Sequence, residues 1–99
     1  MFLVVLTRSG PAWDASTPME EQLGWTEHAA FMDRLVESGF LVLGGPLVDE
    51  IRVVHAVEAA SVDEVRAILA RDPWSGSHLV VETVTPWTIR LDGRDPAPA

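Results

Sequence analysis

Short apolar runs alternate along the chain with longer stretches in which apolar residues recur every three or four positions. The short runs have the length of β-strands and are rich in Val, Leu and Ile, whereas the longer stretches have the period of one helix face. In chain order they predict strand, helix, strand, strand, helix and strand. The predicted strands are residues 2–7, 40–44, 51–58 and 78–85, and the predicted helices are residues 17–38 and 61–70.

Capping residues and glycines mark where the two predicted helices begin and end. Residues 17–20 and residues 61–64 each have the spacing of a capping box, in which a hydroxyl group accepts a hydrogen bond from a backbone N–H. Gly39 suits the left-handed position that ends a helix. Gly24, inside the first predicted helix, costs about 1 kcal/mol relative to alanine, so we expect the first turns to form a separate piece.

This order of elements predicts a ferredoxin-like α+β domain. We expect one antiparallel sheet in the strand order 4-1-3-2, with both helices on one face. A chain of 99 residues has room for a single hydrophobic core. We assign the domain to residues 1–91, with a short extra strand at 88–91, and a flexible C-terminal tail to residues 92–99, which are rich in proline and charge.

The predicted strands carry apolar residues on both faces, although two helices can cover only one face of a sheet. In the last strand, Leu79 and Val81 point to one face and Val80 and Val84 to the other. Monomers rarely leave an apolar patch of more than roughly several hundred Å² uncovered. We therefore expect a homodimer in which two sheets stack face to face. The alternative is that the C-terminal segment folds over this face.

The net negative charge of the chain limits the kinds of molecule that it can bind. Seven arginines oppose 15 acidic residues, and the net charge is −8, so we expect neither nucleic acid nor an anionic membrane as a partner. The chain has no cysteine and no lysine, which excludes disulfides, thiolate chemistry and Schiff-base chemistry. The apolar start at residues 2–6 is too short for a signal peptide or a membrane span, so we expect a cytoplasmic protein.

The most informative polar residue is His28, which lies on the apolar stripe of the first predicted helix. A histidine there must find a partner inside the protein or line a cavity. Asp72 follows the second predicted helix and can reach His28, because the two helices pack side by side. An aspartate that accepts from one ring nitrogen fixes the tautomer and leaves the other nitrogen free for proton transfer. The alternative is a satisfied core histidine beside an aspartate that only ends a helix.

Five further residues can shape a ligand site near this pair. Trp74 and Trp25 can stack on a flat unsaturated ring, although core or interface packing is the commoner role of tryptophan. Gly45 and Pro46 end the second predicted strand, where the glycine can let a ligand or another backbone approach closely. A simple turn at the end of the strand is the alternative. Arg8, at the end of the first predicted strand, can meet an acidic substrate group or form a surface ion pair.

We expect no metal site. His55 and His78 fall on the third and fourth predicted strands, which the first strand separates by about 10 Å. Side-chain atoms that bind one zinc ion lie much closer together than this, since each lies about 2 Å from the metal.

A set of residues spread along the chain forms one combined pattern: His28 with Phe31, Met32 and Leu35, then Gly39, Gly44-Gly45-Pro46, Asp72-Pro73-Trp74 and Pro86-Trp87. This pattern resembles that of the YCII-related family. The resemblance covers nearly the whole domain, and it implies a ferredoxin-like fold that pairs into a dimeric α+β barrel. It also implies a site centred on His28 and Asp72 that uses no metal or organic cofactor. Muconolactone-isomerase-like members of the wider barrel group act on small cyclic or phenolic metabolites.

Three functions are consistent with the sequence. The first is a small homodimeric enzyme that isomerises a cyclic metabolite or eliminates a group from it, with His28 as general acid and base and Asp72 as its orienting partner. In this enzyme Trp74 and the edge at Gly45 and Pro46 shape the pocket. The second is a non-catalytic module that binds a small molecule or assists a larger enzyme. The third is an oxygenase-like or haem-handling protein, since this superfold hosts such functions.

Overall fold

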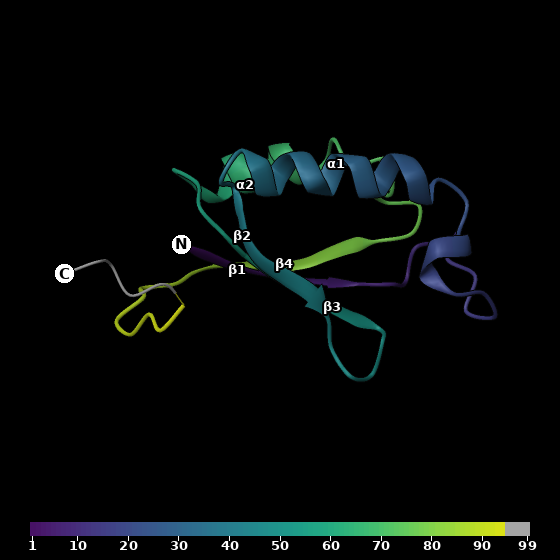
Figure 1. Ribbon diagram of the computed structural model, residues 1–99, viewed down its shortest axis with the longest axis horizontal. Helices are drawn as coiled ribbons and strands as arrows, with labels where there is room; N and C mark the ends of the chain where they lie inside the picture. The colour runs from purple at the N-terminus through teal and green to yellow at the C-terminus, as the bar shows by residue number, and fades with distance from the viewer. Residues whose placement is uncertain (95–99) are drawn as a thin grey trace.

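The computed structural model describes residues 1–94 and forms one four-stranded sheet with two helices on the same face (Figure 1). The strand order β2-β3-β1-β4 and the antiparallel pairing confirm the predicted ferredoxin-like α+β arrangement. No helix among the described residues has the length and apolar character needed to cross a membrane. The elements are β1 (Phe2–Thr7), the 3-10 helix η1 (Met19–Glu21), α1 (Trp25–Glu37), β2 (Leu41–Pro46), β3 (Arg52–Val57), α2 (Val62–Leu69) and β4 (Val80–Pro86).

The hydrophobic core lies between the two helices and the sheet. Alternate residues of β1 point into it, as expected for a strand with one face covered. Each fully buried Val or Leu side chain contributes about 1.5–3 kcal/mol to folding. The main core residues are Phe2, Val4 and Leu6 of β1, Phe31 and Leu35 of α1, Val65 and Leu69 of α2, and Val53 and Val57 of β3.

The first helical segment begins differently from the prediction. The structure divides it into η1 and α1, as the cost of Gly24 suggested, and Gly24 precedes α1 with a left-handed φ of 81°. The capping box at residues 17–20 is wrong, because Pro18 precedes η1 and no side chain caps its N-terminus. A Cβ at position 24 would lie 3.2 Å from Trp74 Nε1, so glycine is favoured both by the backbone angle and by the packed indole.

The end of α1 and the start of α2 agree with the predictions from the sequence. Gly39 follows Ser38, the residue that caps the C-terminus of α1, and has a φ of 84°. Its N–H donates to the Val36 carbonyl oxygen. The Ser61 hydroxyl accepts from the Glu64 N–H at 3.1 Å, which caps α2. The predicted strand at residues 88–91 is wrong, because residues 87–94 have no regular secondary structure. Five residues of the predicted tail, 95–99, lie outside the described residues.

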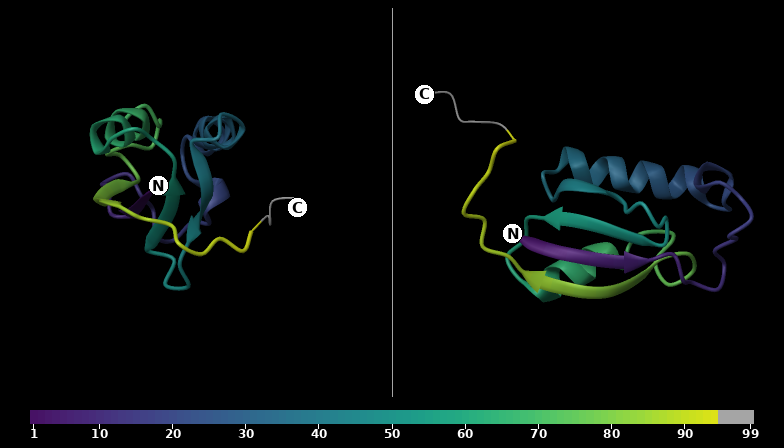
Figure 2. Two further views of the ribbon diagram at one scale, coloured as in Figure 1. Left: turned by 90° about the vertical axis from the view of Figure 1, so that its left-hand side faces the viewer. Right: turned by 90° about the horizontal axis from the view of Figure 1, so that it is seen from below.

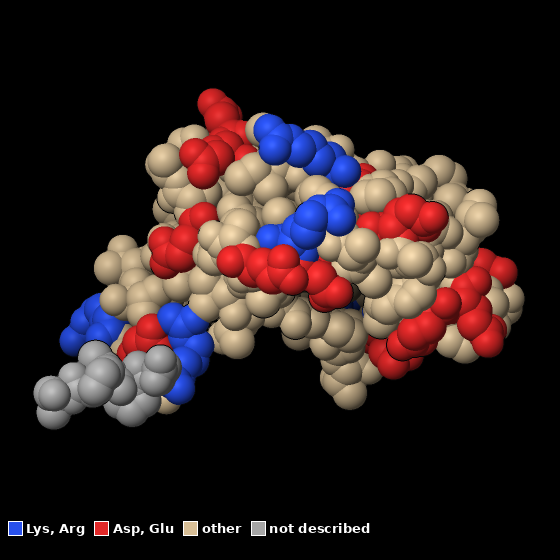
Figure 3. Space-filling model, turned by 45° about the horizontal axis from the view of Figure 1, so that its top comes forward, with Lys and Arg blue, Asp and Glu red and all other residues tan. Residues whose placement is uncertain are grey.

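Residues 1–94 leave most of the sheet face opposite the helices uncovered (Figure 2). A shallow apolar groove on this face is lined by residues that include Leu3, Leu43, Val54 and Trp87, and the Leu43 and Trp87 residues are 57% and 46% exposed. The described part of the C-terminal segment runs past Leu43 and Ala56 at one end of the sheet and does not cover the whole face. Over the helix side, acidic side chains form several groups with arginines between them (Figure 3).

Candidate active site

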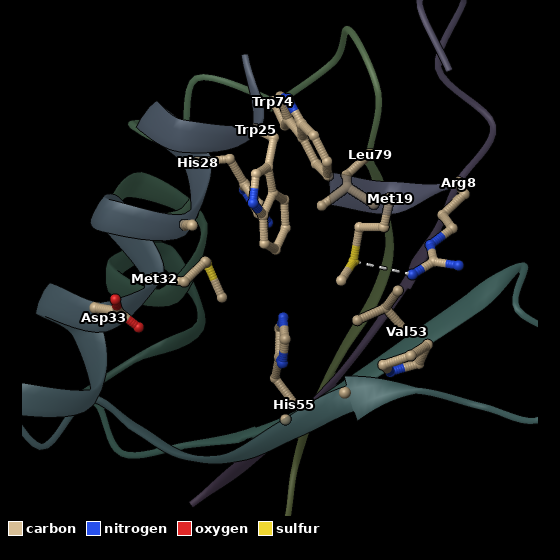
Figure 4. Close-up of a pocket in the computed structure, with 14 residues that line it drawn as sticks. Arg8, Met19, Trp25, His28, Met32, Asp33, Val53, His55, Trp74 and Leu79 are labelled. Atoms are coloured by element: carbon tan, nitrogen blue, oxygen red, sulfur yellow. Dashed lines mark hydrogen bonds between the residues drawn. The ribbon is translucent and has the colours of Figure 1, made fainter. Parts of the chain in front are cut away.

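A cavity of about 450 Å³ opens between α1 and the sheet (Figure 4). Its volume is within the range of small-molecule sites, which are typically about 300–1,000 Å³ and mostly apolar with a few polar groups. Its apolar lining comes from Met19, Trp25, Ala29, Met32, Pro46, Val53, Trp74 and Leu79, with the two glycines Gly44 and Gly45, and its polar lining comes from Arg8, His28, Asp33 and His55.

His28 lines this cavity and contacts Asp72, which does not line it. His28 Nδ1 lies 2.8 Å from Asp72 Oδ1 and 2.9 Å from Oδ2, and both residues are buried. An ionised carboxylate can only accept, so Nδ1 carries the hydrogen and donates it. The second ring nitrogen, Nε2, has no hydrogen-bond partner within residues 1–94, and the His28 ring forms part of the cavity wall. The pair therefore leaves one ring nitrogen of a cavity-lining histidine, Nε2, without a partner in the described part of the chain.

Trp74 locks the pair in place. Its ring stacks on His28 with centroids 4.1 Å apart and planes 7° from parallel, and the residue is only 2% exposed. Its backbone N–H donates to Asp72 Oδ1 at 2.9 Å, so one carboxylate oxygen accepts from both neighbours. The indole Nε1–H donates to the Leu23 carbonyl oxygen at 2.9 Å, just before α1. This network ties the start of α1 to the end of α2 and restricts the His28 ring to one orientation.

Two further aromatic side chains, which the sequence did not predict to lie here, pack against Trp74 on the face away from His28. His78 stacks there with centroids 4.6 Å apart, and Trp13 meets both rings edge-on. The Ser77 hydroxyl lies 3.0 Å from His78 Nδ1, while Nε2 is buried and unpartnered within residues 1–94. Burial lowers the pKa of His78, and the charge on His28 lowers it further. No sequence periodicity links residues 13, 28, 74 and 78, so a pattern search could not have found this stack.

The structure also brings the other candidate residues to the same place. Trp25, Gly45 and Pro46 line the cavity directly, and Trp25 lies 5.8 Å from the His28 ring, centroid to centroid. Asp72 does not line the cavity but supports His28 from behind.

Arg8 borders the cavity and is held by neutral partners. Its Nη1 donates to the Glu50 carbonyl oxygen at 2.8 Å, its Nη2 lies 3.3 Å from Met19 Sδ, and its guanidinium lies 4.8 Å from the Trp13 ring centroid. Arg8 forms no ion pair with another described residue, in contrast to the surface alternative considered above. A positive charge without a carboxylate partner therefore remains available beside a mainly apolar cavity.

His55 is a lining residue that the sequence analysis treated only as a potential metal ligand. It points from β3 into the cavity (Figure 4), and burial lowers its pKa to about 4. The alternation of β3 was the available signal, since His55 shares the helix-facing side with the buried residues Val53 and Val57. Among residues 1–94, no group of three or more His, Asp or Glu side chains is arranged to hold a metal ion.

Fold and site together define a class: a ferredoxin-like α+β domain with a buried histidine–aspartate pair beside an apolar cavity. The model of the YCII-related domain family matches residues 1–88, nearly the whole chain, and the chain belongs to this family. A search of curated proteins finds no match.

Proposed function

We propose that this protein is a cofactor-free enzyme that moves a proton on a small cyclic metabolite, in an isomerisation or an elimination. One observation carries the proposal. His28 is held at Nδ1 by a buried carboxylate, while its ring forms part of the wall of a largely apolar cavity. A histidine oriented in this way can accept a proton at Nε2 and return it elsewhere, which contributes about 10²–10⁴-fold to a rate.

Each neighbour has a distinct role in this mechanism. Asp72 is a positioning residue, because its carboxylate fixes the His28 tautomer and stabilises the imidazolium that forms during proton transfer. Trp74 holds both groups and stacks against the imidazolium, an arrangement that favours a cation over an aromatic face. The apolar walls exclude water from the reacting atoms, which strengthens these electrostatic interactions.

The lining residues favour a flat ring with an acidic group as the ligand. Trp25, Met32 and Met19 offer apolar and polarisable surface to a ring. Arg8 can bind a carboxylate or an enolate oxygen at the margin of the cavity. Gly45 and Pro46 supply a wall without bulky side chains, which leaves room for the ring edge.

The test uses β,γ-unsaturated rings, whose double bond moves into conjugation after proton transfer. Cyclohex-3-en-1-one, α-angelica lactone and their carboxylate-bearing counterparts are incubated with the protein, and double-bond migration is followed by NMR. We expect wild type to accelerate at least one of them, and His28→Gln to slow that reaction by about 10²–10⁴-fold. Glu27→Gln, at the exposed neighbouring position, is the matched control and should retain the wild-type rate. An unchanged rate in folded His28→Gln removes the mechanism.

A non-catalytic binding module is the second candidate, since the same cavity suits a ligand whether or not chemistry follows. Benzoate is a flat, charged probe, benzyl alcohol lacks its charge, and cyclohexanecarboxylate lacks its flatness. Chemical shifts of the Trp25 and Trp74 indole N–H groups report binding of each probe. Tight, selective binding of benzoate with no turnover of any unsaturated ring favours the binding module over the enzyme.

We also propose that a second copy of the chain covers the open sheet face. Leu3 and Val54 are half-buried there and Leu43 is exposed, which gives two stacked sheets an apolar contact. Val54→Glu places a charge in the middle of this face, whereas Thr26→Glu places one on the exposed side of α1. Sedimentation should show a dimer for wild type and Thr26→Glu and a monomer for Val54→Glu. A monomeric wild type contradicts the proposal.

A further inference from the structure

The cavity contains a second histidine that the mechanism above leaves unused. The ring of His55 points up from β3, on the side of the cavity opposite α1 (Figure 4), and the residue is only 5% exposed. Its Nδ1 is buried and has no hydrogen-bond partner within residues 1–94. An unpaired buried polar group costs about 1–3 kcal/mol, a cost that valine or leucine at this position would avoid.

The neighbouring strand β2 has a glycine where the His55 ring needs space. Gly44 of β2 pairs with His55 of β3, and a Cβ at position 44 would lie 2.8 Å from His55 Cε1 and still closer to Nδ1. A Cβ at Gly45 would meet nothing within 4 Å, so the requirement is specific to position 44. An aromatic ring over a cross-strand glycine stabilises an edge strand. Phenylalanine would serve that purpose equally well, which leaves the imidazole nitrogens without a structural explanation.

We propose, building on the function proposed above, that His55 is a second catalytic residue, which removes a proton from the ligand on the sheet side while His28 delivers one on the helix side. The surroundings of the two rings favour this division of roles. Asp72 lies against His28 and stabilises a positive charge there, whereas no carboxylate contacts His55 among the described residues. The cavity lies between the two rings and can hold one flat ligand in contact with both.

The proton transfers balance for a β,γ-unsaturated ring ketone. His55 Nε2 takes a proton from the carbon between the carbonyl group and the double bond, so a C–H bond breaks and an N–H bond forms. The electron pair moves into a dienolate. His28, protonated at Nε2, gives its proton to the γ carbon, and the double bond shifts into conjugation. His55 then has one proton more and His28 one fewer, and exchange with solvent restores both.

Burial supports the role of His55 as the base. Burial first, and then the charge on His28, lower the pKa of His55 to about 4, while Asp72 opposes the shift. The ring is therefore unprotonated near neutral pH and ready to accept a proton. Oppositely tuned pairs of titratable groups commonly divide the acid and base roles in this way.

The experiment separates the two transfers in D₂O, with the unsaturated ring that wild type converts fastest. His55→Phe keeps the ring over Gly44 but removes both nitrogens. We expect it to lose product formation and deuterium uptake at the carbon next to the carbonyl group, each by at least tenfold. His28→Gln should lose product formation but retain deuterium uptake at that carbon. His78→Phe, the same change at a buried histidine outside the cavity lining, measures the cost of losing an imidazole as such.

The outcomes distinguish the two proposals. If wild type converts a ring and His55→Phe converts it equally fast, the role of His55 is overturned while that of His28 stands. If wild type converts none of the rings, the proposed function is contradicted, and ¹⁵N spectra with benzoate decide whether His55 faces a ligand. A benzoate-induced shift of His55 Nε2 supports the contact, and an unchanged resonance overturns it.

Discussion

The two histidines that line the cavity lie in opposite surroundings. On the helix side, His28 donates to a carboxylate and stacks on Trp74, and both N–H groups of Trp74 are also bonded. On the sheet side, His55 has an unpaired Nδ1 and packs over a glycine. One ring is therefore fixed by polar partners and placed beside a negative charge, whereas the other is fixed by packing alone and stays neutral.

Removal of Asp72 should give the largest loss of stability. In Asp72→Ala the Nδ1–H of His28 and the backbone N–H of Trp74 both lose their buried acceptor. Two unsatisfied donors at about 1–3 kcal/mol each predict a loss of roughly 3 kcal/mol in the free energy of unfolding. Urea unfolding at neutral pH measures the change.

Asp72→Asn is the matched control, because its amide oxygen can still accept one of these hydrogen bonds. We expect it to lose less than half as much stability as Asp72→Ala. Equal, small losses in both variants would show that the pair does not hold the helix side together.

The pH dependence of the free energy of unfolding should report the protonation of His55. The pKa of His55 is about 4 in the folded protein and about 6.5 in the unfolded chain, so the unfolded state binds more protons between these values. Stability therefore rises with pH from about 4 to 6.5 and is lost on acidification, with His55 contributing up to about 3 kcal/mol. His78 adds to the same trend, since burial also lowers its pKa.

Urea unfolding of His55→Phe across the same pH range isolates this contribution. The variant should be at least as stable as wild type at pH 7 and should show a much shallower slope below pH 6.5. A slope as steep as that of wild type would mean that folding does not lower the pKa of His55.

The smallest effect should come from adding one methyl group to β2, either at Gly44, beneath the His55 ring, or at Gly45, away from it. Gly44→Ala forces the ring to move, and overpacking of this kind costs about 1–3 kcal/mol. Gly45→Ala, where a Cβ meets nothing within 4 Å, should change the free energy of unfolding by less than about 0.5 kcal/mol. Equal effects at the two positions would show that Gly44 is not matched to the histidine.

Much of the fold was predictable because local patterns and global topology agree. The strand and helix periods gave the element order, and one rule about crossovers gave the strand order that the structure confirms. The prediction of the first helix start was wrong because two local sequence signals compete there. Residues 17–20 resemble a capping box, but Gly24 adopts a left-handed angle that separates them from α1, and Pro18 takes the position before a 3-10 turn.

The site was predictable only where topology brings element ends together. His28 and Asp72 lie at the start of one helix and just after the other, and helices side by side on a sheet place these ends close to each other. The contact between Gly44 and the His55 ring depends on strand register, which a single residue of slip would change. The stack of His28, Trp74 and His78 depends on loop geometry, which has no sequence period.

A crystal structure of the protein with benzoate tests the central claim most directly, because it shows which side chains a flat, charged ring touches. We predict the ring between α1 and β3, with His28 Nε2 within hydrogen-bond distance of the ligand, the carboxylate at Arg8 and His55 on the opposite side. Benzoate bound elsewhere on the protein, with His28 and Asp72 unchanged and the cavity filled only by solvent, would contradict the proposed site.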